Sequence, residues 1–182
     1  MGKLEAGCLL IAEPFLGDPN FERSVILLCE NNSDGSFGLV LNQPTEYNLG
    51  DLLSKNVYPD IKVNVGGPVQ RDTLHFLHTN PAAITEGIEI VKGLYWGGNF
   101  DKMLENLNLG IISIDQVRFF IGYSGWSAGQ LDQEMKRNSW IISEGDSESI
   151  MKTSKEYWRD TLKKMGGDFK VMANYPIDPR LN

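Results

Sequence analysis

The chain has 182 residues, of which 41% are hydrophobic and 23% charged. This composition is typical of a folded globular protein and excludes the disordered and membrane-embedded classes. Its 17 basic and 24 acidic side chains give a formal charge of -7, which disfavours direct, non-specific binding to nucleic acid or to anionic membranes. At this length we expect a single domain that spans residues 1–182.

The cysteines and the N-terminal segment bear on the cellular compartment. Cys8 and Cys29 are the only cysteines, and each lies inside an apolar run, which predicts two buried free thiols in a reducing environment. The N-terminal segment lacks the length and charge of a signal peptide, and no apolar stretch is long enough to span a membrane. We therefore expect a cytoplasmic protein with no membrane contact.

The first two thirds of the chain are rich in predicted strands. The Asp34-Gly35 pair indicates a hairpin turn, and two weaker patterns predict helices at 48–53 and 99–107, the second with Asn99 as its N-cap. The predicted strands are short apolar runs at residues 7–12, 25–30, 37–41, 61–65, 73–78 and 89–96.

The last third alternates between predicted strands and helices. A strand at 117–121 is followed by a glycine-rich turn at 122–129, a helix from Gln130 to Arg137 and a strand at 139–142. One longer helix is expected next, beginning at Asp146 or Ser147 and ending at Gly166. This order predicts a mixed sheet with packed helices, an α+β or α/β fold.

Residues 125–129 match the G-x-S-x-G pattern of serine hydrolases, in which the serine follows a strand and precedes a helix. Ser127 would need a histidine as its base, and in that fold the histidine follows the serine in the chain. His75 and His78 both precede Ser127. We therefore interpret the stretch as a turn that packs the core around Trp126, and we expect no catalytic residue.

Metal and cofactor sites are equally disfavoured. His75 and His78 are three residues apart on a predicted strand, so their rings should point to opposite faces. No G-x-G-x-x-G or G-x-x-x-x-G-K-[ST] motif is present. We predict neither a metal site nor a cofactor.

The stretch 152–170 contains six basic and three acidic side chains. Opposite charges at helical spacing are typical of a solvated helix face. This stretch is nevertheless the sole candidate for a DNA-recognition helix in the sequence.

Six segments carry a wider resemblance: LLIAEPFLGDPNFERSVILLCE, GSFGLVLNQP, VNVGGPV, LHFLHT, GYSGWSAGQLDQEM and NSWI. In this order, over about residues 7–140, they resemble the AlgH/YqgE family of bacterial proteins. The resemblance implies a mixed α/β fold in which a strongly bent sheet forms a partial barrel with helices outside it. It implies no enzymatic activity, and members are often labelled transcriptional regulators.

The family resemblance also selects candidate site residues. Ser127 is not required by the family pattern, and Gln43 stands where an arginine is common. We predict a protein that binds an unknown small molecule or protein partner and does not catalyse a reaction. The alternatives of a transcriptional regulator and of a hydrolase using Ser127 stay open. The predicted ligand-binding residues, expected to share one surface, are Asp18, Arg23, Asn42, Gly66, Gly67, His78, Tyr123, Trp126 and Gln130.

Overall fold

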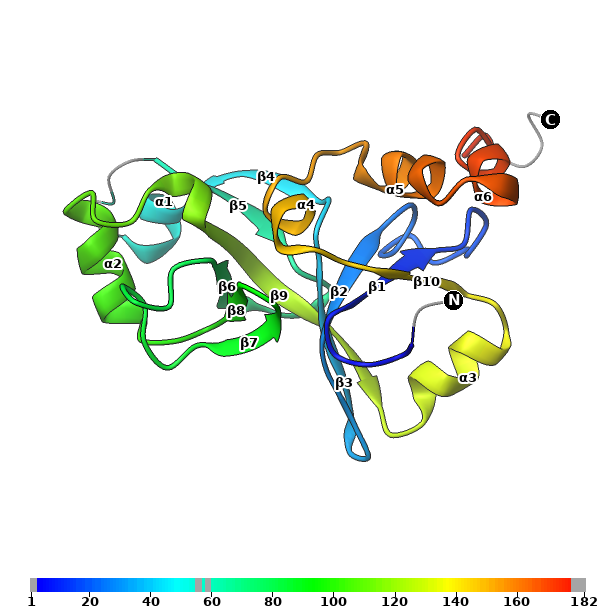
Figure 1. Cartoon of the computed structure of the whole chain (residues 1–182), viewed down its shortest axis with the longest axis horizontal. Helices are drawn as coiled ribbons and strands as arrows, with labels where there is room; N and C mark the ends of the chain where they lie inside the picture. Colours follow the sequence, from blue (N-terminus) through cyan, green and yellow to red (C-terminus); the bar gives the residue numbers. More distant parts are fainter. Residues whose placement is uncertain (1–2, 55–56, 58–59, 178–182) are drawn as a thin grey trace.

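A computed structural model describes residues 3–54, 57 and 60–177. Within this part of the chain, ten strands form one mixed sheet (Figure 1). Off its main path, β4 (Pro44–Asn48) pairs with β5 (Lys62–Val65), which runs parallel to β9. Along the path the order is β10 (Trp140–Glu144), β1 (Cys8–Ala12), β2 (Val25–Asn32), β3 (Gly35–Val40), β9 (Val117–Ser127), β6 (Val69–His78), β8 (Leu94–Trp96) and β7 (Ile88–Val91).

The helices lie in three groups around the sheet (Figure 1). Helices α1 (Leu49–Leu53) and α2 (Phe100–Asn108) lie at one end, and the 3-10 helix η1 (Ile114–Gln116) leads from α2 into β9. Helix α3 (Gln130–Lys136) lies near the other end, and α4 (Ser147–Met151), α5 (Tyr157–Met165) and α6 (Gly167–Met172) lie along one side. No helix in the described residues is long and apolar enough to cross a membrane.

The sheet is curved, because strands from both ends of its path contribute to the same core. Ile141 on β10 and Val91 on β7 pack against one cluster that also contains Leu27 and Leu39 from the middle strands. The two edge strands approach without pairing, and Ser147 after β10 donates a hydrogen bond to the carbonyl of Gly93 at 3.3 Å. The sheet is therefore bent into an open, partial barrel, which confirms the fold that the resemblance implied.

Helices α2 and α3 cover the side of the sheet that faces away from this first cluster. Met103 and Leu107 of α2 pack with Phe119 of β9 in a second cluster, and Leu131 of α3 packs with Trp140 in a third. Helices α4 to α6 instead close the concave side, where Trp158 and Leu162 join the first cluster. Both cysteines are buried free thiols, as predicted.

Several predicted strands have different bounds in the structure, and two of these differences bear on the site. The run 89–96 is a hairpin of β7 and β8 that turns at Gly93. The strand predicted at 117–121 continues to Ser127, because residues 124–127 find a second partner in β3. The predicted glycine turn at 122–129 therefore shrinks to the two residues before α3.

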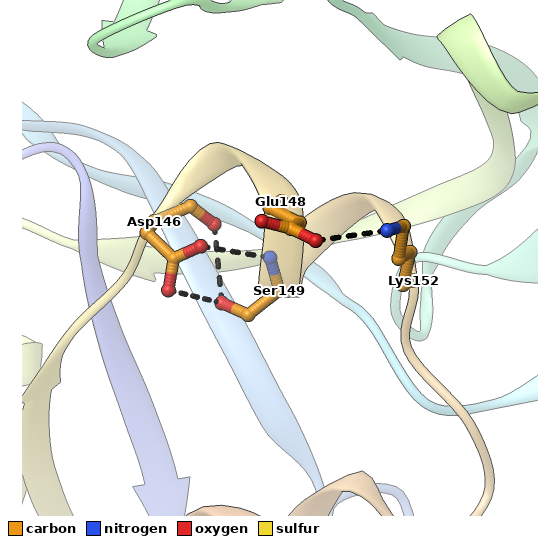
Figure 2. Close-up of polar contacts among 4 residues, drawn as sticks. All are labelled: Asp146, Glu148, Ser149 and Lys152. Atoms are coloured by element: carbon orange, nitrogen blue, oxygen red, sulfur yellow. Dashed lines mark hydrogen bonds and ion pairs between the residues drawn. The ribbon is translucent and has the colours of Figure 1, made fainter.

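The prediction of one long helix, beginning at Asp146 or Ser147 and ending at Gly166, is wrong, because two helices, α4 and α5, occupy this stretch. Asp146 does cap α4, accepting a hydrogen bond from the Ser149 amide at 2.9 Å, as Figure 2 shows. The chain then leaves the helix because Thr153 donates its hydroxyl to the carbonyl of Leu41 at 2.7 Å. The basic stretch 152–170 is consequently divided between the end of α4, α5 and α6, and Lys152 pairs with Glu148 at 2.9 Å (Figure 2).

Candidate functional site

The first hydrophobic cluster, on the concave side of the sheet, is called the concave core. Four half-buried rings meet at its margin: Phe37 on β3, His75 on β6, Trp96 on β8 and Tyr123 on β9. We call these residues the aromatic cluster. Phe37 lies at its centre, with ring centroids 4.9 Å from Trp96, 5.2 Å from Tyr123 and 5.4 Å from His75. Such tilted pairs stabilise one another beyond the area they bury. The cluster thus combines a fixed geometry with partial solvent exposure.

Strand register positions three of these rings. On β3, β6 and β8 each aromatic residue is two positions from a buried leucine of the concave core: Phe37 from Leu39, His75 from Leu77, and Trp96 from Leu94. Residues two apart on a strand share a face. The leucines therefore fill the core, and the rings extend it toward its margin.

Tyr123 reaches the same face through a break in the alternation of β9. Phe120 points into the concave core, so regular alternation would send Tyr123 to the other face. Gly122 lies between them with a φ of 65°, in the left-handed region that favours glycine. This residue resets the alternation and brings Tyr123 against Phe37.

Because Gly66 and Gly67 have no side chain, the segment between β5 and β6 can lie close to β9 at Gly122 and Tyr123. A Cβ atom on Gly66 would lie 2.4 Å from the carbonyl oxygen of Gly122, and one on Gly67 would lie 2.2 Å from that of Tyr123. The Gly66 carbonyl accepts hydrogen bonds from the Val40 amide at 2.8 Å and from the Ser124 hydroxyl at 3.1 Å. These two glycines therefore keep the segment between β5 and β6 close to β3 and β9.

His75 is the ionisable member of the aromatic cluster. Burial lowers its pKa below the ordinary value of 6.5, so the ring is neutral at pH 7. Its Nε2 atom lies 3.2 Å from the hydroxyl of Thr73. The cluster therefore presents uncharged rings at neutral pH.

Trp96 differs from the other three tryptophans. The indole N–H groups of Trp126 and Trp140 donate to Glu134, and that of Trp158 donates to the carbonyl of Ala12 at 2.8 Å. The indole N–H of Trp96 has no hydrogen-bond partner among the described residues, and its ring is half-buried. It is a donor available beside the four rings.

Asp18, Arg23 and Asn42 form a separate structural group. Asn42 accepts from the Val25 amide at 2.9 Å and donates to the Arg23 carbonyl at 2.9 Å, which fixes the chain entering β2. The Arg23 guanidinium lies over the Trp158 ring and donates to the Tyr175 carbonyl. Asp18 caps its own turn by accepting from the Asn20 amide. These contacts give the three residues structural roles.

Trp126 and Gln130 belong to a second group, centred on Glu134 of α3. One carboxylate oxygen accepts the indole N–H of Trp126 at 2.9 Å and that of Trp140 at 2.8 Å, and the other accepts from Gln130 at 3.0 Å. The charge of Glu134 makes these strong hydrogen bonds. They fasten α3 to the sheet.

Ser127 lies where β9 ends and α3 follows, so the strand-to-helix context predicted for G-x-S-x-G is present. Its hydroxyl donates to the side-chain oxygen of Gln130 at 3.0 Å. His75 bonds to Thr73 on β6, and neither ring nitrogen of His78 makes a hydrogen bond. The geometry therefore supplies Ser127 with no histidine base among the described residues.

His78 lies on the other face of β6, as the spacing predicted. It is fully buried and stacks on Tyr95 at 5.3 Å, and neither ring nitrogen makes a hydrogen bond of normal geometry although the backbone of Gly97 is close. It pairs with Val117, nine positions before Trp126 on β9. Measured along the strand, this is a path of roughly 30 Å. Because His78 is fully buried it does not lie on a shared surface, and the grouping of the other eight candidate residues stays a prediction.

Metal binding finds no support in the geometry. Among the described residues, no three histidine, cysteine, aspartate or glutamate side chains come together in a way that could hold a metal ion.

The comparisons with known proteins bear on the whole chain. A family model described as AlgH-like matches residues 9–170. The chain belongs to the AlgH-like family. A UPF0301 protein of Cytophaga hutchinsonii is 44% identical over 181 residues, covering 98% of this chain and 100% of that one. A UPF0301 protein of Chlorobaculum parvum is 42% identical over 180 residues, covering 98% and 96%.

Two solved structures share the AlgH-like fold. The solution structure of AlgH from Pseudomonas aeruginosa is 26% identical, with a TM-score of 0.76 and coverage of 97% of this chain and 98% of that one. A crystal structure of a Corynebacterium diphtheriae protein is 19% identical, with a TM-score of 0.79 and coverage of 96% and 94%, and it shows the fold alone. These matches confirm the family and the fold, and their names state no activity.

Sequence reasoning missed most of the aromatic cluster of this AlgH-like chain. Only Tyr123 was among the predicted site residues, because Phe37, His75 and Trp96 lie on separate strands with no shared motif. The repeated spacing of a ring and a leucine two positions apart is the signal that could have found them.

Arg118 was also missed, a half-buried cation on β9. It donates to the carbonyls of Ile150 and Leu41 and lies over the Phe120 ring, and burial lowers its pKa to about 10. A single charge inside the apolar run 117–121 was the available signal. Its contacts tie the end of α4 to β9, which is a structural role.

Proposed function

We propose that this AlgH-like protein acts by binding and not by catalysis, and that the aromatic cluster receives a planar aromatic group of a small molecule. The observation that carries the proposal is the partly exposed set of four uncharged rings, one of which, Trp96, has an indole N–H without a partner among the residues that the structure describes. A planar ligand can stack on such rings, and the indole can donate to an acceptor on the ligand. Stacking of one base-like ring on an aromatic side chain contributes about 1–3 kcal/mol.

The other functions weighed from the sequence have less support. Ester hydrolysis by Ser127 would need a base that its surroundings do not provide, as described above. DNA recognition would rest on the basic stretch, where Arg159 donates to Glu156 and to the carbonyl of Ala173. Its charges are thus engaged partly within the fold. We also propose a cytoplasmic location, supported by the two buried free thiols.

The test uses ligand-observed saturation-transfer NMR. Adenosine and p-cresol serve as planar probes, and cyclohexanol serves as a non-planar probe of comparable polarity. We expect saturation to pass to the planar probes from the wild-type protein, and the Trp96→Ala variant to bind them about tenfold more weakly, as the loss of one stacking contact predicts.

The matched control is Tyr47→Ala, which removes a 55% exposed ring from β4, a strand that contributes no ring to the aromatic cluster. This variant should bind like the wild type. The proposal fails if Trp96→Ala binds the planar probes as well as the wild type does, or if cyclohexanol receives as much saturation as they do.

A further inference from the structure

Three aliphatic side chains protrude into solvent where α2 ends and η1 begins. Leu109 is 65% exposed, Ile111 58% and Ile114 50%, and we call these residues the aliphatic patch. Residues 106–114 carry no charged side chain, although the protein as a whole has a charge of -7. Contiguous exposed apolar surface of this kind marks an interaction site.

The backbone holds the aliphatic patch in a defined shape. The amides of Ile111 and Ile112 both donate to the carbonyl of Asn106, at 2.9 and 3.2 Å, and the Asn106 side chain donates to the Ala83 carbonyl at 2.8 Å. Leu107 and Ile112 are buried in the second core cluster and anchor the loop from below. The exposed side chains are therefore presented by an ordered loop.

A hollow lies beside the protruding side chains. It has a volume of about 430 Å³, and its apolar lining comes from Leu107, Leu109, Ile112 and Ile114. Ile111 protrudes but does not line the hollow. One loop thus carries both an apolar projection and an apolar recess.

A projection beside a recess is self-complementary. In a contact across a two-fold axis, the same patch serves both partners, and each residue pairing occurs twice. The absence of charge in 106–114 lets two copies of an acidic protein meet there without placing like charges at the centre. We propose that two copies of this chain associate through the aliphatic patch, each placing Ile111 toward the hollow of the other.

The rim of the patch carries charges of both signs, which suits a reciprocal contact. Asp115 follows Ile114 in the chain. A hydrogen bond from Ser113 is the largest cause that holds the pKa of this carboxyl below its ordinary value, and the positive charge of Lys152 also contributes. Lys152 also pairs with Glu148 (Figure 2). A partner with a uniform charge of either sign would meet repulsion at one of these groups.

The size of the patch sets the expected strength. A stable interface buries about 800 Å² on each partner, which is more than three side chains supply. The association should therefore be weak and become visible only at high micromolar protein concentrations. This association is independent of ligand binding at the aromatic cluster.

Sedimentation equilibrium from about 10 µM to about 1 mM covers this range. The wild-type weight-average mass should rise from the monomer value of 20.4 kDa toward twice that value as concentration increases. The variant Ile111→Asp should stay at the monomer mass throughout. Its thermal unfolding should match that of the wild type, because the side chain is exposed.

The control is Val171→Asp, which places the same charge at a 57% exposed aliphatic position on α6. It should associate like the wild type, which separates loss of the patch from added repulsion. The proposal is overturned if the wild type stays monomeric up to the highest concentration, or if Val171→Asp weakens association as much as Ile111→Asp does.

Discussion

Replacing Gly122 with alanine tests the break in side-chain alternation that turns Tyr123 toward the aromatic cluster. Gly122 has a φ of 65°, and a Cβ atom there would lie 2.7 Å from the carbonyl oxygen of Gly67 and 2.8 Å from that of Val69. Both neighbours are backbone atoms, so they cannot move as the end of a side chain could. The variant must therefore carry backbone strain and also push β9 away from the backbone of Gly67 and Val69.

The magnitude follows from these two contributions. A left-handed conformation costs a non-glycine residue about 1–2 kcal/mol, and overpacking a tight interior site costs about 1–3 kcal/mol more. Gly122→Ala should thus lower the free energy of unfolding by about 2–5 kcal/mol. For a chain of this size, each kcal/mol lowers the melting temperature by about 2–4 °C.

Gly129→Ala is the matched control. Gly129 has a similar φ of 72°, but a Cβ atom there would meet nothing within 4 Å. This variant should lose only the conformational contribution, about 1–2 kcal/mol. Urea unfolding followed by tryptophan fluorescence measures both losses. Equal losses of unfolding free energy in the two variants would refute the idea that the backbone around Gly122 is tightly packed.

Two further predictions concern side chains that the sheet encloses. Glu134→Ala should lower the free energy of unfolding by about 2–4 kcal/mol, because it leaves the indole N–H groups of Trp126 and Trp140 without an acceptor; a loss below that of an exposed-site alanine variant in a thermal melt would contradict this. Burial lowers the pKa of His78 and of His75, so the unfolded chain binds protons more readily than the folded protein, and stability should be full above about pH 6.5 and decline below it. His78→Phe should flatten this decline when the free energy of unfolding is compared at about pH 7.5 and about pH 5, and an unchanged decline would show that His78 does not contribute.

Much of the fold could be predicted from local patterns. The apolar runs at 7–12 and 25–30 became β1 and β2 because their hydrophobic residues needed burial on both faces of the curved sheet. The N-caps at Asn99 and Asp146 were also correct, since a side-chain acceptor at a helix start acts locally.

What local patterns could not predict depended on distant partners. Residues 124–127 look like part of a glycine turn, and they continue the strand because β3 lies alongside. The predicted helix at 147–165 broke because Thr153 bonds to Leu41, more than a hundred positions earlier in the chain.

The candidate site was harder to predict than the fold for the same reason. The family motifs singled out Trp126 and Gln130, whose contacts with Glu134 fasten α3 to the sheet. The aromatic cluster gathers residues from four strands, and Tyr123 enters it only through the break at Gly122. Motif matching finds residues that the fold needs, and the exposed rings became visible only in three dimensions.

The four indole N–H signals in a ¹H–¹⁵N NMR spectrum show whether a planar group binds beside Trp96. Trp126, Trp140 and Trp158 are buried and their indole N–H groups are hydrogen-bonded, whereas that of Trp96 has no partner in the described part of the chain. Binding beside Trp96 predicts that titration with adenosine gives a saturable shift of the Trp96 signal while the other three stay in place. A Trp96 signal that does not move, or four signals that move together, would contradict it.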